Sequence, residues 1–393
     1  MAEIKGVPAI RFKGFSDEWN QDKLRNLCEE FQSGNFIKAS DIKTLGDYPV
    51  YGGNGIRGYT DTYNHDGAFA IIGRQGALCG NMNISFGKAY FTEHAVAVNA
   101  NQSSDTTFLF YLLGKMNLGQ YSGQSAQPGL AVSKLTELLE YVPKQDEQTQ
   151  IGSYFQHLDK LISLHHAKVN KLTNLKKAML EKLFPKQGAD MPEIRFKGFA
   201  GAWEVEDIGK LTQVIDPHPS HRAPDAVLQG VPFIGIGDIS ENGKLDLSSV
   251  RIVSEDIYLE HSRRYTLSEG DFAYGRVASI GKIIDLSKNV LSKYTYSPTM
   301  ALIKPISVNS DYLKAYLGTE SFKNLVDNKT TGSTRKSLGV EALRAMPVLL
   351  PTDKEQTKIG SYFQNLDKLI TLHHTELEKL NNLKIACLEK MFV

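Results

Sequence analysis

EQTQIGSYFQHLDKLISLHHAKVNKLTNLKKAMLEKLF, residues 147–184, returns at residues 355–392 as EQTKIGSYFQNLDKLITLHHTELEKLNNLKIACLEKMF. The two copies align without gaps, and 27 of their 38 positions are identical. Each copy closes a longer segment. These two segments share little except near their starts, where AIRFKGFSDEW (Ala9–Trp19) is echoed by EIRFKGFAGAW (Glu193–Trp203). A nearly constant sequence therefore occurs twice, each time at the end of a different segment. This is the layout of an adaptor with two different reading heads.

The repeat divides the 393 residues, too many for a typical single domain, into four segments. We predict a first globular head at residues 1–146, a first spacer helix at 147–187, a second head at 188–354 and a second spacer helix at 355–393. The hydrophobic content of 41% and the aromatic content of 9% are enough for two heads with real cores.

Composition excludes several classes of protein. The sequence contains no signal peptide and no apolar run near the ~20 residues that span a bilayer, so we expect a cytoplasmic protein. The three cysteines are far apart and lack ligand spacing, which argues against disulfides and a zinc site. A formal charge of +1 is neutral on nucleic-acid binding, because any field that attracts DNA must come from local arrangement.

Both heads carry the pattern of strands and turns. Short or alternating apolar runs such as residues 67–74 and 231–239 are bounded by Gly, Asn and Asp. Residues 108–116 and 311–326 are typical of helices. We therefore predict two α/β heads with twisted, mostly antiparallel sheets, so that the whole chain is of the α+β class.

Each copy of the repeat predicts a long amphipathic helix of about 30 residues, roughly 45 Å long. The apolar stripe of such a helix must pack against another apolar surface, and the stripe of the other copy can provide one. The two helices would then form an antiparallel coiled coil with pseudo-two-fold symmetry. The alternative is that each helix packs only on its own head. Gly152 and Gly360 predict a close backbone contact or a cap. For the partner or helix interface we expect these leucines: Leu158, Leu161, Leu172, Leu366, Leu369 and Leu380.

Motifs for chemistry are missing from the sequence. It has no GxxxxGK[ST] phosphate loop, no complete dinucleotide loop and no Asn-Pro-Pro-aromatic methyltransferase motif. The adjacent histidines at 165–166 and 373–374 point about 100° apart on a helix, so we expect no metal site there. We predict no catalytic residues.

Polar loops rich in Gly, Asn, Gln, Arg and Lys recur at matching places in both heads. Amides can pair with adenine and guanidinium groups with guanine, while hydroxyls, Lys and backbone amides bind phosphates. An ordinary turn is the competing interpretation of each loop taken by itself. The predicted DNA-binding residues are Tyr51, Asn54, Arg57, Tyr59, Arg74, Gln75, Gln124, Ser125 and Gln127 in the first head, and Arg276, Lys282, Tyr294, Ser333, Thr334, Arg335 and Lys336 in the second.

Two unlike bodies, each headed by IRFKGF and a tryptophan and each followed by a near-copied EQxxIGxYFxxLDKLIxLHH helix, resemble the DNA-specificity subunit of type I restriction–modification systems. The segments YGGNGIRGY (Tyr51–Tyr59) and GR-x-G (Gly73–Gly76) also resemble that family's target-recognition domains. In the second body Gly275–Arg276 matches less well, with Val277 taken as the residue that stands where glycine is expected. The resemblance covers essentially the whole chain.

The resemblance implies that each head reads one half of a split, asymmetric DNA site and that the paired helices set the distance between the halves. It also implies partners: double-stranded DNA, two methyltransferase subunits that modify adenine N6, and two restriction/translocase subunits. The cofactors S-adenosylmethionine, ATP and Mg would belong to those partners and none to this chain.

Three alternatives remain open in the sequence. The chain could serve a methyltransferase that has no nuclease partner. It could be a DNA-independent coiled-coil scaffold that presents two ligand-binding heads, although loops with amides and arginines point away from this. It could be an enzyme itself, but no nucleophile, base and orienting residue cluster or repeat.

Overall fold

The computed structural model describes residues 6–123, 129–218, 220, 222–239, 245–286, 293–331 and 336–393. They form two compact units. Unit 1 holds the first head, the beginning of one long helix and the end of the other (residues 1–166 and 375–393). Unit 2 holds the second head and the remaining parts of both helices (residues 167–374). No helix of the described chain is both long and apolar enough to span a membrane.

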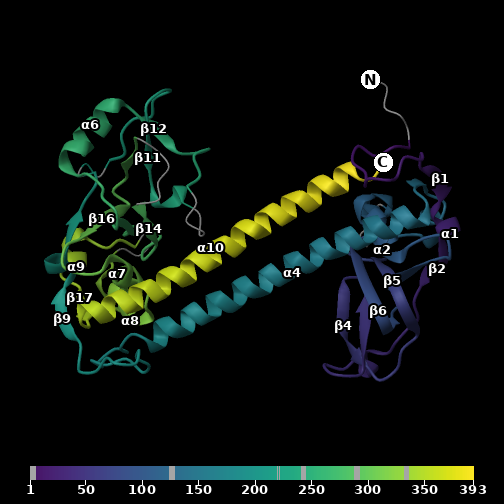
Figure 1. The fold of residues 1–393 in the computed structure, drawn as a ribbon, viewed down its shortest axis with the longest axis horizontal. Coiled ribbons are helices and arrows are strands. Elements are labelled where there is room, and N and C mark those ends of the chain that lie inside the picture. The colour runs from purple at the N-terminus through teal and green to yellow at the C-terminus, as the bar shows by residue number, and fades with distance from the viewer. Residues whose placement is uncertain are drawn as a thin grey trace. The chain divides into compact units, whose positions relative to one another are not determined.

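The first head is built on a six-stranded sheet, which is antiparallel except where β3 lies parallel to β6. Two of its paired strands, β5 and β6, lie next to each other in Figure 1. Apolar residues of its central strands, such as Ile71 and Val98, are fully buried. In spatial order the strands are β2 (Cys28–Ser33), β7 (Ala95–Ala100), β5 (His65–Gly73), β6 (Met82–Phe91), β3 (Tyr48–Gly52) and β4 (Gly55–Thr60).

A second layer of the first head joins this sheet to the long helices. Helix α2 packs on the sheet, and its cap is the Asp105 carboxylate, which accepts a hydrogen bond from Phe108 N at 2.8 Å. The other elements are β1 (Asn20–Lys23), paired with β8 (Leu139–Val142), and α1 (Leu24–Leu27), α2 (Thr106–Lys115), α3 (Val132–Leu135), η1 (Ala39–Asp41) and η2 (Leu118–Tyr121).

The second head divides its strands between smaller sheets. The four-stranded one has the order β10 (Thr212–Ile215), β16 (Met300–Pro305), β13 (Phe272–Gly275) and β14 (Ile283–Asp285). The three-stranded one has the order β12 (Arg251–Val253), β11 (Val231–Ile234) and β15 (Thr295–Tyr296), and β9 (Glu204–Asp207) pairs with β17 (Pro347–Leu350). The remaining elements of this head are α5 (Ile208–Leu211), α6 (Glu255–Arg264), α7 (Ser310–Leu317), α8 (Glu320–Lys329), α9 (Val340–Arg344) and η3 (Ile236–Asp238).

Residues 311–326, expected to form one helix, form parts of two. Helix α7 ends at Leu317, and Thr319 caps α8 by accepting a hydrogen bond from Phe322 N at 3.2 Å. Gly318 and Thr319 break the apolar period because glycine disfavours helix and threonine is a good cap.

The long helices are α4 (Gln145–Lys182) and α10 (Asp353–Lys390), each of 38 residues and therefore longer than the 30 expected. In unit 1 they run antiparallel, because Tyr154 contacts Cys387 while Asp159 pairs with Lys384 further along α4. In unit 2, Lys176 and Asp367 make the equivalent ion pair at 2.6 Å. The same pair of residue types thus recurs at an offset of 208, and the predicted antiparallel helices and internal repeat are confirmed.

The apolar stripe of each long helix packs both on a head and on the other long helix, so both of the packing partners considered above are present. The start of α4 packs into the core of the first head through Ile151 and Phe155, while the end of α10 joins the same core through Phe392. In unit 2 the start of α10 and the end of α4 do the same, through Phe363 and Phe184. Each unit therefore binds one helix beginning and one helix end, and the helices also contact each other.

In each unit the repeated IRFKGF segment binds both long helices, and we call this contact the clasp. In unit 1, Ile10 N donates to the last turn of α10 at Lys390 O (2.9 Å), and Arg11 binds the Glu147 carboxylate at the start of α4 with two hydrogen bonds of 2.7 Å. Glu147 is only 2% exposed, and its carboxylate raises the pKa of Arg11. An arginine fork supplies a buried carboxylate with two charge-assisted hydrogen bonds.

Unit 2 repeats this clasp residue for residue. Ile194 N donates to Lys182 O at 2.9 Å, and Arg195 binds Glu355 with two hydrogen bonds of 2.7 Å. The echoed segments near the start of each body therefore hold a helix beginning and a helix end together.

Gly152 and Gly360 lie where the sequence predicted a close backbone contact, which is confirmed. A Cβ on Gly152 would lie 2.8 Å from Phe108 N, and one on Gly360 would lie 2.6 Å from the Asn309 side chain. Each glycine lets a long helix approach the capped beginning of a head helix, α2 or α7.

Candidate nucleic-acid interface

Three turns of the first head meet at one end of its sheet. They are the β3–β4 turn at Gly53 and Asn54, the loop from Arg74 to Asn81, and the β6–β7 turn that contains His94. A Cβ on Gly53 would lie 3.2 Å from His94 O, and one on Gly73 would lie 2.1 Å from Gly53 O. We call this place the three-turn junction; a side chain at Gly73 would clash with the backbone there, and one at Gly53 would be tightly packed.

Backbone hydrogen bonds hold the junction of the first head. Gly73 N donates to Asn81 O at 2.8 Å, and Gly80 N donates back to Gly73 O at 2.7 Å. Arg74 N donates to His94 O at 2.9 Å. Leu130 N donates to Arg74 O at 2.9 Å, which brings the end of the loop at residues 122–135 to the same place.

The second head builds its junction with the same bonds. Gly275 N donates to Lys282 O at 2.7 Å, and Gly281 N donates to Gly275 O at 3.0 Å. Arg276 N donates to Thr299 O at 2.9 Å and Leu338 N donates to Arg276 O at 2.8 Å. The two heads, which share little sequence, therefore share one backbone framework here.

Two of the residues predicted in the first head lie at the surface of its junction. Asn54 is exposed and accepts a hydrogen bond from Asn81 Nδ2 at 3.0 Å. Gln75 is also exposed, and its Oε1 is 2.9 Å from His94 Nδ1. The structure thus brings these two predicted residues together with Asn81 and His94, which the prediction missed.

The other predicted residues of the first head have different surroundings. Arg57 is exposed on β4, and its aliphatic part covers Gly52. Tyr51 is half-buried against Phe91, with ring centroids 5.7 Å apart, and Tyr59 is half-buried on β4.

Arg74 is partly turned inward. Its guanidinium donates to Ser33 Oγ at 3.1 Å and to Leu130 O at 3.4 Å. These bonds hold the loop ends, so the side chain has a structural partner in the free protein.

In the second head, the predicted residues that the structure describes are largely bound within the protein. Arg276 is 7% exposed and pairs with Asp216 at 2.8 Å, and Lys282 donates to the carbonyl of Ile239. Tyr294 is half-buried with its ring 5.3 Å from that of Tyr296.

Lys336 is exposed and lies 3.6 Å from Asp327. It also accepts a hydrogen bond from Ala278 N at its backbone oxygen, which ties its segment to the junction. Six predicted residues lie outside the described part of the chain: Gln124, Ser125, Gln127, Ser333, Thr334 and Arg335.

The departure from the GR-x-G pattern in the second head lies at Ala278 and not at Val277. Gly76 has φ +87° in the first head, and Ala278, the residue three after Gly275, has φ +63°. Val277 occupies the position of Gln75, since each forms a bridge to the returning loop, at Ser337 and Gly129 respectively. The left-handed turn is therefore kept with alanine, at the cost of backbone strain.

Beside the second junction, two histidines form a buried chain of hydrogen bonds. His218 Nε2 donates to Arg222 O at 3.0 Å, so its Nδ1 is free to accept from His261 Nε2 at 2.9 Å. The Thr295 hydroxyl then donates to His261 Nδ1. Burial, with His218 as a further cause, lowers the pKa of His261 from 6.5 to about 4, so the His261 ring is neutral at pH 7.

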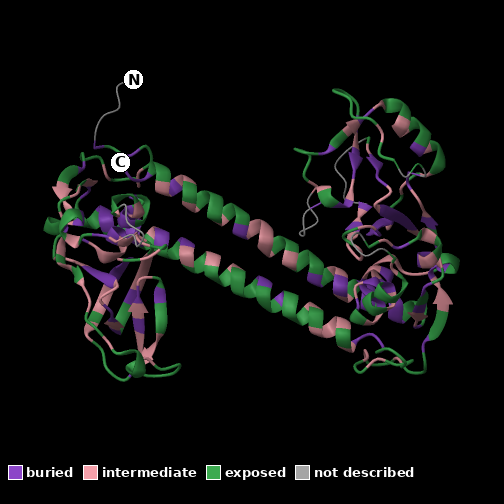
Figure 2. Cartoon of the chain, turned by 180° about the vertical axis from the view of Figure 1, so that it is seen from behind, coloured by how far each residue is buried: buried purple, intermediate pink, exposed green. Residues whose placement is uncertain are grey.

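The interface leucines fall into two groups. Leu158, Leu172 and Leu366 are buried, and Leu380 is half-buried against the first head's core. Leu161 and Leu369 are 44% and 42% exposed, and Figure 2 shows exposed residues along both long helices. The exposed pair is again related by the offset of 208, so each helix repeats the same uncovered position.

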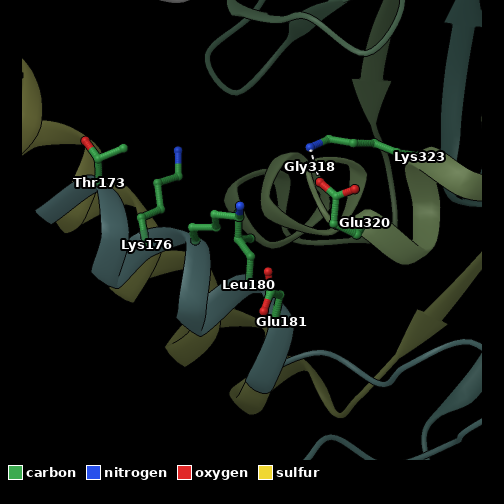
Figure 3. Close-up of a pocket in the computed structure, with 8 residues that line it drawn as sticks. Thr173, Lys176, Leu180, Glu181, Gly318, Glu320 and Lys323 are labelled. Carbon is green, nitrogen blue, oxygen red and sulfur yellow. Dashed lines mark hydrogen bonds and ion pairs between the residues drawn. The ribbon is translucent and has the colours of Figure 1, made fainter. Parts of the chain in front are cut away.

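Unit 2 also contains a hollow of about 370 Å³ between the end of α4 and the beginning of α8 (Figure 3). Two of its three lysines already have partners, because Lys176 binds Asp367 at 2.6 Å and Lys323 binds Glu320 at 2.8 Å. None of the predicted site residues lines it. Over the described residues, no three His, Cys, Asp or Glu side chains are placed to hold a metal ion.

Comparison with known proteins identifies the family. The family model for the type I restriction modification DNA specificity domain matches residues 16–174 and again 203–382. The specificity subunit of the EcoprrI type I restriction enzyme of Escherichia coli is 42% identical over 153 residues, 37% of this chain and 38% of that one. A putative type I restriction enzyme specificity subunit of Haemophilus influenzae is 24% identical over 379 residues, 94% of this chain and 91% of that one.

A solved structure shares the fold. The S subunit of a type I restriction–modification system from M. genitalium superposes with a TM-score of 0.69 at 14% identity, covering 98% of this chain and 99% of that one. Specificity subunits are the non-catalytic, DNA-recognising components of these systems, in agreement with the family model that matches both halves. The chain belongs to the type I restriction–modification DNA specificity family, as a specificity subunit.

Proposed function

We propose that this subunit recognises a bipartite, asymmetric DNA site, with one half read by each head. The observation that carries the proposal is the three-turn junction, which has the same backbone bonds in both heads and different side chains. Gln75 and His94 of the first junction correspond to Val277 and Thr299 of the second. Because direct readout depends on side-chain donors and acceptors, such a pair of heads would read different sequences.

The long helices offer the surface for partner proteins. Leu161 and Leu164 are 44% and 56% exposed, and their counterparts Leu369 and Leu372 are 42% and 53% exposed. Large apolar side chains left in solvent at repeated positions favour a protein partner that binds twice. We propose a methyltransferase subunit on each copy, which supplies S-adenosylmethionine and methylates adenine N6. Restriction/translocase subunits, with ATP and Mg, would join that complex.

Methylation mapping tests this function. The chain would be produced with a type I methyltransferase subunit, and genomic methyladenine would be located by long-read sequencing. We expect one split motif with two different halves. A motif with identical halves, or the absence of methylation from a soluble complex of the two proteins, would contradict the proposal.

A further inference from the structure

The exposed amides of the first junction form two hydrogen-bonded couples. In the first couple Asn81 Nδ2 donates to Asn54 Oδ1 at 3.0 Å. In the second, His94 Nδ1 lies 2.9 Å from Gln75 Oε1 and, since that oxygen only accepts, the imidazole nitrogen donates. Asn54, Gln75 and Asn81 are exposed, and His94 is half-exposed.

The first couple presents one acceptor and one donor side by side. Its internal bond uses one hydrogen of Asn81 and one lone pair of Asn54. The Oδ1 of Asn81 and the Nδ2 of Asn54 keep their capacity for another molecule. Adenine offers the complementary pair in the major groove, a donor at N6 and an acceptor at N7.

The backbone under these couples is held in place before any DNA binds. Gly73 leaves no room for a side chain against Gly53 O, and the hydrogen bonds from Gly73 and Arg74 join the three turns. Side chains that already bond each other on a fixed backbone lose less conformational freedom on binding. The couples therefore form a pre-organised surface.

The second head cannot present the same surface from the same framework. Val277 takes the place of Gln75 and has no polar side-chain atom. Lys282 takes the place of Asn81, and its ammonium group is bound to the carbonyl of Ile239. Whatever the second head reads, these two positions do not read it by amide pairing.

We propose that Asn81 and Gln75 are specificity-determining residues of the first head and that the Asn81–Asn54 couple reads an adenine within the duplex. Asn81 supplies the acceptor for N6, Asn54 supplies the donor to N7, and Gln75 contacts a neighbouring base edge through its free Nε2. This inference rests on the proposed function, because it names the groups by which one head performs it.

The test uses the full chain in complex with its methyltransferase, on DNA duplexes that carry the methylated motif of the wild-type chain. Gln75→Ala and Asn81→Ala are made separately and together, and binding is measured to duplexes changed at one base pair at a time. We expect discrimination to fall about tenfold to hundredfold at one or two base pairs of one half-site, including an A·T pair, with the other half unaffected.

Gln21→Ala is the matched control, because Gln21 is an exposed amide of the same head on β1, away from the junction. It should leave discrimination unchanged. Gln75 is an exposed residue, so the Gln75→Ala variant keeps the test valid if the Asn81 variant folds poorly. Unchanged discrimination at both half-sites in Gln75→Ala and in the double variant would overturn the inference while leaving the proposed function intact. If the wild-type chain directed methylation to no split motif, both the inference and the proposed function would be overturned.

Discussion

The first and second three-turn junctions have the same backbone bonds, but their side chains have different roles. In the first head, exposed amides bond each other or His94 and keep donors and acceptors for a ligand. In the second head, Arg276 is held by Asp216 and Lys282 by backbone carbonyls. A framework fixed by glycines and main-chain bonds can therefore carry different recognition surfaces without a change of fold.

The largest effect is expected at the clasps, which tie each head to both helices. Arg11→Ala and Arg195→Ala would leave Glu147 and Glu355 buried without their partners, which costs about 3–5 kcal/mol of unfolding free energy. Hydrogen exchange, which follows each unit separately, should show protection lost in unit 1 for the first variant and in unit 2 for the second. Lys13→Ala, at an exposed neighbouring position, is the control. Similar losses in both units from one variant would show that the clasps are not local.

The second largest effect is expected for Gly73→Ala and Gly275→Ala, which change the corresponding glycine of each junction. A Cβ on Gly73 would meet Gly53 O at 2.1 Å, and one on Gly275 would meet Ser279 O at 2.4 Å. Both contacts are with backbone, so each variant should lose about 1–3 kcal/mol by overpacking. Denaturant titration would measure this, with Gly237→Ala as the control, where no atom lies within 4 Å of the added Cβ. If Gly275→Ala left the stability unchanged while Gly73→Ala lowered it, the two junctions would not be equivalent.

Lowering the pH should reduce the stability of the region around His261, beside the second junction. The folded pKa of about 4 lies below the ordinary 6.5, so the unfolded chain binds more protons between these values. The stability that the neutral ring contributes is complete above pH 6.5 and is lost as the pH falls towards 4. Hydrogen exchange of α6 at pH 7 and pH 5 would detect this, and His261→Gln should remove the dependence. An unchanged pH dependence in that variant would assign the effect to other groups.

The smallest effect concerns the left-handed residue of each loop. Gly76→Ala should cost about 1 kcal/mol, and Ala278→Gly should relieve a similar strain, partly offset by the greater freedom of glycine when unfolded. Thermal melts of the two variants should therefore shift in opposite directions. Destabilisation by both would mean that Ala278 contributes contacts that outweigh its strain.

The helical frame could be predicted from sequence because its signals are local and repeated. The apolar stripe and the near-identical copies are enough to predict two long helices, and Gly152 with Gly360 marks their close contacts. The order of strands in each sheet could not be predicted, since it depends on pairings between distant segments such as β2 and β7.

The candidate site was predictable only in outline. The predicted residues Asn54 and Gln75 lie exposed in loops that the fold brings together, but the inward turn of Arg276 depends on Asp216, 60 residues away. Asn81 follows Gly80, whose φ of +89° marks a turn, so the sequence carried a signal for it. His94 carried none, because only the tertiary fold brings it to Gln75.

The most direct test of two independent heads on one frame is replacement of residues 1–146 by the corresponding segment of another specificity subunit. The exchanged chain would be produced with the same methyltransferase, and its methylated motif would be mapped by long-read sequencing. The account predicts that one half of the motif changes and that the other half stays as in the wild-type chain. A change in both halves, or in neither, would contradict it.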